Sequence, residues 1–204
     1  MKKRTPVPWQ LLIACLLPAV LSGCLGAGRP TEFYALTPLA PPAAVPAGAP
    51  SAVVAVLPAV VPAAIDRPQI VTRTGENQLA LAEFNRWGGS LKEEVSRVLV
   101  ENLGALLAER RVKVMSDRLA LEPACVVAVS VNRFDGRLGE RVWLNADWTL
   151  RDPRQKKTLA VKSSALQESV TGPGYAELVA AQSRALAALS RDIAAELAAV
   201  LKTP

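Results

Sequence analysis

The sequence lacks histidine: none of its 204 residues is one. Histidine is the commonest general base and the commonest metal ligand in proteins. Its absence excludes Ser-His-Asp and Cys-His nucleophilic sites and leaves carboxylates as the main acid–base groups. No paired acidic motif, phosphate-binding loop or Gly-x-Ser-x-Gly turn is present either. We therefore expect no catalytic residue, no metal site and no enzyme activity.

The first residues carry the pattern of a secretory signal peptide. Lys2, Lys3 and Arg4 precede an apolar run at residues 11–21, which is too short to anchor the chain by spanning a bilayer. Leu21-Ser22-Gly23-Cys24 then resembles the lipobox of bacterial lipoproteins, in which the cysteine is acylated and becomes the new N-terminus. The alternative is an ordinary signal peptide with an incidental cysteine. We expect removal of residues 1–23 and a diacylglycerol and an N-acyl chain on Cys24.

Cysteine is scarce, with three in the chain. Cys15 would leave with the signal peptide, and Cys24 would carry lipid. Cys125 would then be alone, so no intramolecular disulfide can form. Because Cys125 begins the apolar run Cys125-Val126-Val127-Ala128-Val129, we expect a small buried side chain rather than a reactive thiol.

The charge balance does not indicate nucleic-acid binding. The full chain has 24 basic and 18 acidic residues, and removal of Lys2, Lys3 and Arg4 would leave 21 against 18, or about +3. Leu25, rather than Asp, follows the lipobox cysteine, which favours delivery to the periplasmic face of the outer membrane. We assign residues 24–50 to a Pro/Ala-rich tether that contains a short Phe-Tyr-Ala-Leu segment. Its proline-rich part is either a semi-rigid membrane spacer or an unselected loop.

Hydrophobic periodicity predicts one α+β periplasmic domain at residues 51–204. Alternating apolar residues predict strands, whereas apolar spacings of three and four predict two amphipathic helices. Ser90 and Glu93 have the spacing of a capping box at the first helix. The predicted fold is a mainly antiparallel sheet with both helices packed on one face. The predicted strands are residues 51–57, a hairpin at 69–83, 112–115, 124–134, 141–151 and 158–170, and the predicted helices are 90–110 and 175 to the C-terminus.

Arginine and tryptophan outside the helices are the candidate partner-binding residues, because both types are enriched at interface hot spots. The alternative is structural: Trp87 would fill the junction between sheet and helix, and the arginines would pair with carboxylates. Trp143 alternates with the apolar residues of its strand, which predicts that it points outward. The candidates are Arg67, Arg73, Arg86, Trp87 and Trp143.

Four short motifs follow one another in the mature chain. They are Phe33-Tyr34-Ala35-Leu36, Val54-Ala55-Val56-Leu57-Pro58, Ile65-Asp66-Arg67-Pro68-Gln69-Ile70-Val71-Thr72-Arg73 and Asn85-Arg86-Trp87. Their order resembles the PqiC-like lipoproteins, the auxiliary lipoprotein family of ABC-type intermembrane transport. The Asp66-Arg67-Pro68-Gln69-Ile70 stretch is the most specific part. Gly88-Gly89 and the long proline-rich segment depart from the family pattern.

The resemblance implies a non-enzymatic component of an MCE-type intermembrane lipid transport system. Such a lipoprotein would be anchored in the outer membrane and would dock the periplasmic tunnel there, as a possible homo-oligomer. Its partners would be an MCE-domain tunnel protein and the inner-membrane partner of that protein, with no cofactor beyond the lipid on Cys24. The alternative is a periplasmic lipoprotein that assists envelope assembly by binding an outer-membrane protein or the cell wall.

Overall fold

The structure is a computed structural model that describes residues 29–42, 47–117, 119 and 122–201. The predicted signal peptide and Cys24 lie outside the described residues, so their processing and lipidation stay predictions. Residues Thr31–Pro204 form one compact unit, to which the following description refers.

A five-stranded sheet in the described part of this unit confirms the predicted meander and adds a parallel part. The strand order is β5-β2-β6-β7-β8. β6, β7 and β8 pair antiparallel, whereas β2 pairs in parallel with both β5 and β6, so the sheet is mixed. The strands are β2 (Ala52–Val56), β5 (Val112–Ser116), β6 (Cys125–Gly136), β7 (Arg141–Asp152) and β8 (Lys157–Ser169).

The parallel position of β2 explains its sequence. A strand inside a parallel arrangement is covered on both faces and therefore has a continuous apolar run instead of an alternating one. Val54, Ala55 and Val56 are all at most 2% exposed. β7 shows the contrasting pattern, because Val142, Leu144, Ala146, Trp148 and Leu150 are buried while the residues between them are less so.

A second, three-stranded sheet of the described residues has the order β1-β4-β3. The predicted hairpin at 69–83 is present as β3 (Gln69–Gly75) and β4 (Gln78–Trp87), although β4 continues to Trp87. β1 (Glu32–Tyr34) pairs in parallel with the end of β4, with Phe33 opposite Arg86. Phe33 and Tyr34 of the Phe-Tyr-Ala-Leu segment therefore lie in a strand of the folded unit, although we had assigned the segment to the tether.

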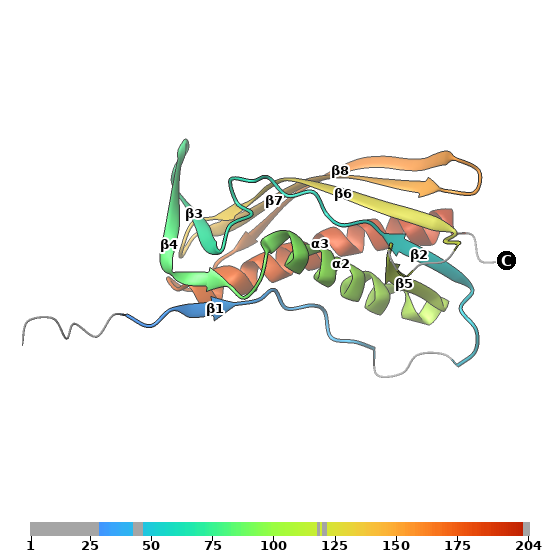
Figure 1. Cartoon of the computed structure of the whole chain (residues 1–204), viewed down its shortest axis with the longest axis horizontal. Helices are drawn as coiled ribbons and strands as arrows, with labels where there is room; N and C mark the ends of the chain where they lie inside the picture. The colour runs from blue at the N-terminus through green and yellow to red at the C-terminus, as the bar shows by residue number, and fades with distance from the viewer. Residues whose placement is uncertain (1–28, 43–46, 118, 120–121, 202–204) are drawn as a thin grey trace, which may run out of the picture. The chain divides into compact units, whose positions relative to one another are not determined.

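Two helices cover one face of the five-stranded sheet, as predicted (Figure 1). They are α2 (Leu91–Leu107), which a short 3-10 turn η2 (Ala108–Arg110) extends, and α3 (Tyr175–Val200). Their apolar stripes are buried; Val95, Leu99 and Leu186, for example, are 0% exposed. Each such side chain contributes about 1.5–3 kcal/mol by leaving water. The α+β class is confirmed.

The start of α2 differs from the predicted capping box. Ser90 is the N-cap residue, but its side chain makes no capping hydrogen bond. Asp66, from the loop before β3, accepts hydrogen bonds at its Oδ1 atom from the Ser90 hydroxyl (3.0 Å) and from the backbone N–H of Lys92 (3.1 Å). A distant carboxylate, rather than the Ser90 side chain, thus accepts a backbone N–H of the first turn, and its charge favours the positive end of the helix.

Candidate partner-binding surface

Asp135 is the centre of a charged cluster on the sheet face that the helices leave uncovered. Its Oδ2 atom accepts hydrogen bonds from Nε and Nη2 of Arg73 on β3, at 3.1 and 2.7 Å. Its Oδ1 atom accepts a bond from Nε of Arg133, at 2.9 Å. The Arg133 guanidinium also lies 4.2 Å from the ring centroid of Trp143. We call Arg73, Arg133, Asp135 and Trp143 the Asp135 cluster.

Asp135 forms ion pairs with Arg73 and with Arg133, and the two arginines are partly exposed at the surface. The Asp135 side chain is 4% exposed, whereas those of Arg73 and Arg133 are 21% and 30% exposed. The hydrogen bond from Arg73 to Asp135 raises the pKa of the guanidinium above its ordinary value, although burial acts in the opposite direction. Arg73 also donates to the backbone carbonyl of Glu76 in the hairpin turn. Arg73 therefore fastens the β3–β4 hairpin to β6.

Two candidates, Arg73 and Trp143, come together in the Asp135 cluster. The sequence analysis missed their partners Arg133 and Asp135. The predicted strand ended at residue 134, but β6 runs to Gly136 and so includes Asp135. A bulge in the β6–β7 pairing lies between Val131 and Arg133. A periodicity argument cannot detect the bulge, because one extra residue changes which side chains share a face.

The other candidates occupy different environments. Trp87 is 4% exposed within the core, so its ring fills the junction that we had considered as the structural alternative. Arg67 is exposed and borders a hollow beside Trp87. Arg86 is half-buried, and its Nε donates to the Glu83 carbonyl at 3.3 Å. No hydrogen bond connects these residues to the Asp135 cluster in the described part of the chain.

The uncovered sheet face beyond the Asp135 cluster is polar. Asp147 on β7 accepts hydrogen bonds from Asn132 on β6 (2.7 Å) and from the Ser163 hydroxyl on β8 (2.5 Å). These bonds lower the pKa of the Asp147 carboxyl below its ordinary value. These side chains therefore link the three neighbouring strands β6, β7 and β8 across the uncovered face.

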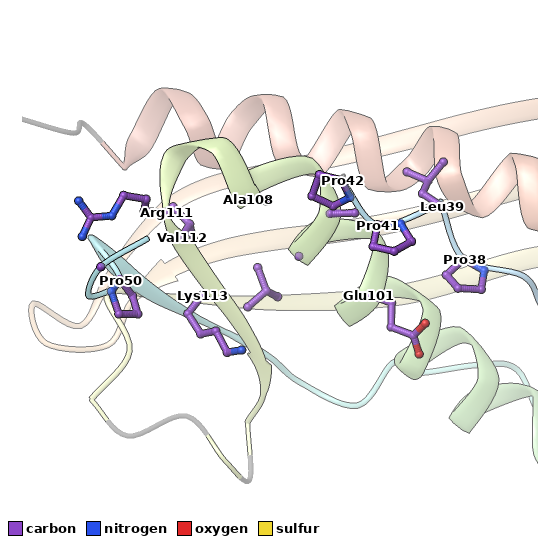
Figure 2. A pocket seen from close by; sticks show the side chains of 14 residues that line it. Pro38, Leu39, Pro41, Pro42, Pro50, Glu101, Ala108, Arg111, Val112 and Lys113 are labelled. Atoms are coloured by element: carbon purple, nitrogen blue, oxygen red, sulfur yellow. The ribbon is translucent and has the colours of Figure 1, made fainter. Parts of the chain in front are cut away.

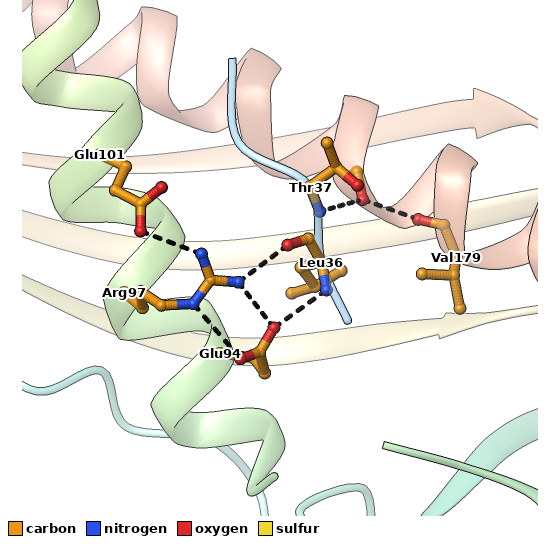
Figure 3. Close-up of polar contacts among 7 residues, drawn as sticks. Leu36, Thr37, Glu94, Arg97, Glu101 and Val179 are labelled. Carbon is orange, nitrogen blue, oxygen red and sulfur yellow. Dashed lines mark hydrogen bonds and ion pairs between the residues drawn. The ribbon is translucent and has the colours of Figure 1, made fainter. Parts of the chain in front are cut away.

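The chain after β1 is bound to both helices by its backbone. Leu36 is buried, its N–H donates to Oε2 of Glu94 (3.0 Å), and its carbonyl accepts from Nη2 of Arg97 (2.9 Å). Figure 3 shows these contacts, with Glu101 completing the ion pair of Arg97. We call residues 36–39 the strap.

The remaining contacts of the strap reach α3 and the centre of α2. The N–H of Thr37 donates to the Ser183 hydroxyl at 3.0 Å. The N–H of Leu39 donates to Oδ1 of Asn102 at 2.7 Å, and Nδ2 of Asn102 donates to the Ser190 hydroxyl at 3.1 Å. Since Asn102 and Ser190 are 0% exposed, these bonds satisfy polar groups that would otherwise be costly to bury. The strap thus belongs to the folded unit.

A hollow of about 500 Å³ lies between the continuation of the strap and α2 (Figure 2). Prolines form one wall and small residues of α2 form the other, while three charged side chains, Glu101, Arg111 and Lys113, stand at its border. The hollow has no constellation of acid, base and nucleophile. Its other lining residues are Pro38, Leu39, Pro41, Pro42, Gly48, Pro50, Gly104, Ala105, Ala108, Val112 and Val114.

Neither a metal centre nor a membrane span is evident in the described residues. They contain no group of three or more cysteine, aspartate or glutamate side chains arranged to hold a metal ion. Across the same residues, no helix combines the length and apolar character needed to cross a membrane.

Comparison with known proteins agrees with this architecture. No curated protein matches the sequence. A crystal structure of an uncharacterized protein matches with a TM-score of 0.70 at 22% identity, covering 83% of this chain and 100% of its own. Protein XCC0632 from Xanthomonas campestris matches with a TM-score of 0.65 at 17% identity, covering 80% of this chain and 93% of its own. At these identities the two structures establish the fold alone.

The sequence itself matches a family model. The match covers residues 34–194, which begin in β1 and end in α3 and so include the strap, both sheets and the Asp135 cluster. The chain belongs to the family of ABC-type transport auxiliary lipoprotein components.

Proposed function

We propose that the protein is an outer-membrane lipoprotein of an MCE-type intermembrane lipid transport system. In this role it would hold the end of a periplasmic tunnel protein at the membrane and would do so without catalysis. The observation that carries the proposal is the family match over residues 34–194. The lipobox at Cys24 and the Leu25 that follows it support the anchor and its location.

The mechanism is positional. The acyl chains on Cys24 would fix the domain to the membrane, since more than one chain is needed for stable anchoring. The uncovered sheet face would bind the tunnel protein, with Trp143 and Arg133 as its central residues. A half-buried tryptophan that stacks under a guanidinium offers apolar area and charge at one point, and both residue types are enriched at hot spots. Several copies could surround one tunnel end as a homo-oligomer.

A detergent pull-down of the full lipoprotein from its native envelope tests the proposal. We expect an MCE-domain protein to co-purify with the wild type, and much less of it to co-purify with the unanchored Cys24→Ala variant. The Trp143→Ala variant tests the surface, with Glu93→Ala as a control because Glu93 is exposed on α2, which covers the opposite face of the sheet. Recovery of only an outer-membrane protein or cell wall would contradict the transport role and favour envelope assembly.

A further inference from the structure

The point at which the chain joins the folded unit limits how far the domain can stand from its anchor. β1 is held by its pairing with β4 and by the Gly88 N–H, which donates to the Tyr34 carbonyl at 2.8 Å. The strap then continues directly into the helix contacts of Leu36 and Leu39. The proline-rich residues follow β1 and the strap, so they cannot add to the reach of the anchor. Only the residues between Cys24 and Thr31 set the distance that the domain can reach from its lipid anchor.

This linker is short compared with the domain. Six residues lie between Cys24 and Thr31, so seven Cα–Cα steps join the two residues. A fully extended chain of that length spans at most about 25 Å. α3 has 26 residues, which correspond to a length of about 39 Å. β1 lies at the N-terminal end of α3 (Figure 1). The β1 end of the domain must therefore lie close to the membrane that holds the lipid, whereas the C-terminal end of α3 can lie beyond the reach of the linker.

The side chains of β1 are divided between its two faces. Glu32 and Tyr34 lie on one face, where the Tyr34 hydroxyl donates to Oε2 of Glu32 at 2.5 Å and lies 3.0 Å from Oδ1 of Asn85. Phe33 points to the opposite face and is 68% exposed. Its partner in the ladder is Arg86, which shares that face. The acidic Glu32 is thus directed away from Phe33, and a basic residue lies beside it.

We propose that Phe33 and Arg86 form a membrane-contact patch for the phospholipid bilayer in which the Cys24 lipid is inserted. The Phe33 ring would enter the headgroup region, where apolar side chains gain by burial next to acyl chains. The terminal nitrogens of Arg86 make no hydrogen bond to the described residues, and they would bind lipid phosphates, which attract basic groups at a membrane surface. This inference rests on the lipid anchor of the proposed function and adds the orientation of the domain.

The test uses the full lipidated protein in vesicles of phosphatidylethanolamine and phosphatidylglycerol. A polarity-sensitive fluorophore is attached to a Phe33→Cys variant and, as a matched control, to a Val161→Cys variant. Val161 has a similar exposed fraction, 71%, but it lies on β8 next to Lys162, which pairs with Glu196 in the C-terminal part of α3. The native Cys125 is buried and would not be labelled in the folded protein.

We expect the fluorophore at position 33 to shift to shorter wavelength and to be quenched at least severalfold more by brominated lipids than the fluorophore at position 161. An Arg86→Gln change should reduce quenching at position 33 on these anionic vesicles but not on phosphatidylcholine vesicles. Equal quenching at the two positions, or none at position 33, would overturn the patch. Loss of MCE co-purification with normal quenching would instead refute the transport role alone.

Discussion

Oδ1 of Asp66 lies 3.1 Å from the backbone nitrogen of Lys92, in the first turn of α2. The same oxygen accepts a bond from the Ser90 hydroxyl, so one side chain from the loop before β3 closes the start of the helix. This contact gives a structural reason for the Asp66-Arg67-Pro68 sequence. The aspartate caps α2, while the proline carbonyl accepts the Trp87 N–H at 2.8 Å.

We expect Asp66→Ala to lower the free energy of unfolding by about 1 kcal/mol, because the first turn of α2 loses its capping acceptor. Urea unfolding followed by circular dichroism measures this loss. Asp66→Asn retains an oxygen acceptor and should lose less. If alanine and asparagine prove equally harmless, Asp66 does not cap the helix.

We expect a substitution in the Asp135 cluster to lower the free energy of unfolding more than Asp66→Ala does. Asp135→Ala would leave two partly buried guanidinium groups without their carboxylate, which should cost about 3 kcal/mol. The β3–β4 hairpin should also exchange its backbone hydrogens faster, because Arg73 no longer fastens it to β6. Urea unfolding and hydrogen exchange measure the two effects.

Asp147 provides the control for Asp135, because it lies on the same sheet face but outside the cluster. Its lowered pKa means that its stabilisation is present above the ordinary aspartate pKa and is lost as the pH falls through the folded-state value. Asp147→Ala should therefore have a small effect at neutral pH that disappears in acid. A loss at Asp147 as large as that at Asp135 would argue against the ion pair as the cause.

A substitution at Asn102 tests how much its hydrogen bond to Leu39 stabilises the strap. Asn102→Ala removes the acceptor of the Leu39 N–H and the partner of Ser190 from a buried site, so we expect a loss of about 2 kcal/mol. Hydrogen exchange at residues 36–39 should accelerate more than exchange within β7. Glu93→Ala, at an exposed position of the same helix, should leave the strap protected. Unchanged exchange at the strap in Asn102→Ala would show that other contacts suffice to hold it.

Counting the reactive thiols tests the state of Cys24 and Cys125, the two cysteines outside the predicted signal peptide. Burial raises the pKa of the Cys125 thiol to about 11, so the native thiol should react with a disulfide reagent at pH 8 far more slowly than a free thiol. Since the folded-state pKa is raised, the contribution of Cys125 to stability is present below its ordinary pKa and is lost as the pH rises through about 11.

If Cys24 carries lipid, the mature protein should show no fast-reacting thiol when native and one per chain in denaturant. A fast-reacting native thiol that disappears in Cys24→Ala would show that Cys24 is not acylated. A fast-reacting thiol that disappears only in Cys125→Ala would show that Cys125 is accessible.

Local patterns predicted much of the fold. The alternation of Val142, Leu144 and Ala146 correctly assigned the buried face of β7, and the apolar spacing of α2 correctly assigned its stripe. These predictions succeed because the side-chain periods of strands and helices repeat over a few residues. The pairing of β2 with β5 and β6 could not be obtained in this way, since an apolar run does not specify its neighbours.

The candidate surface was predicted only in part. Residue type alone suggested Arg73 and Trp143, but nothing near them in the sequence indicates that Asp135, 62 residues after Arg73, receives that guanidinium. Likewise the burial of Trp87 depends on what packs against the end of β4. Residue type selects the interface candidates, but only the tertiary structure shows which of these side chains bind within the domain and which stay exposed.

The sequence by itself determined the two amphipathic helices and the meander, because each depends on residues close together in the chain. It also lacks histidine, and the lipobox that it suggests at Cys24 stays a prediction. Only the tertiary structure decided that the chain after β1 is bound between the helices, through contacts such as that of Leu39 with Asn102, 63 residues away. The physical reason is that an extended segment without its own periodicity acquires a position only from the donors and acceptors that distant elements present to its backbone.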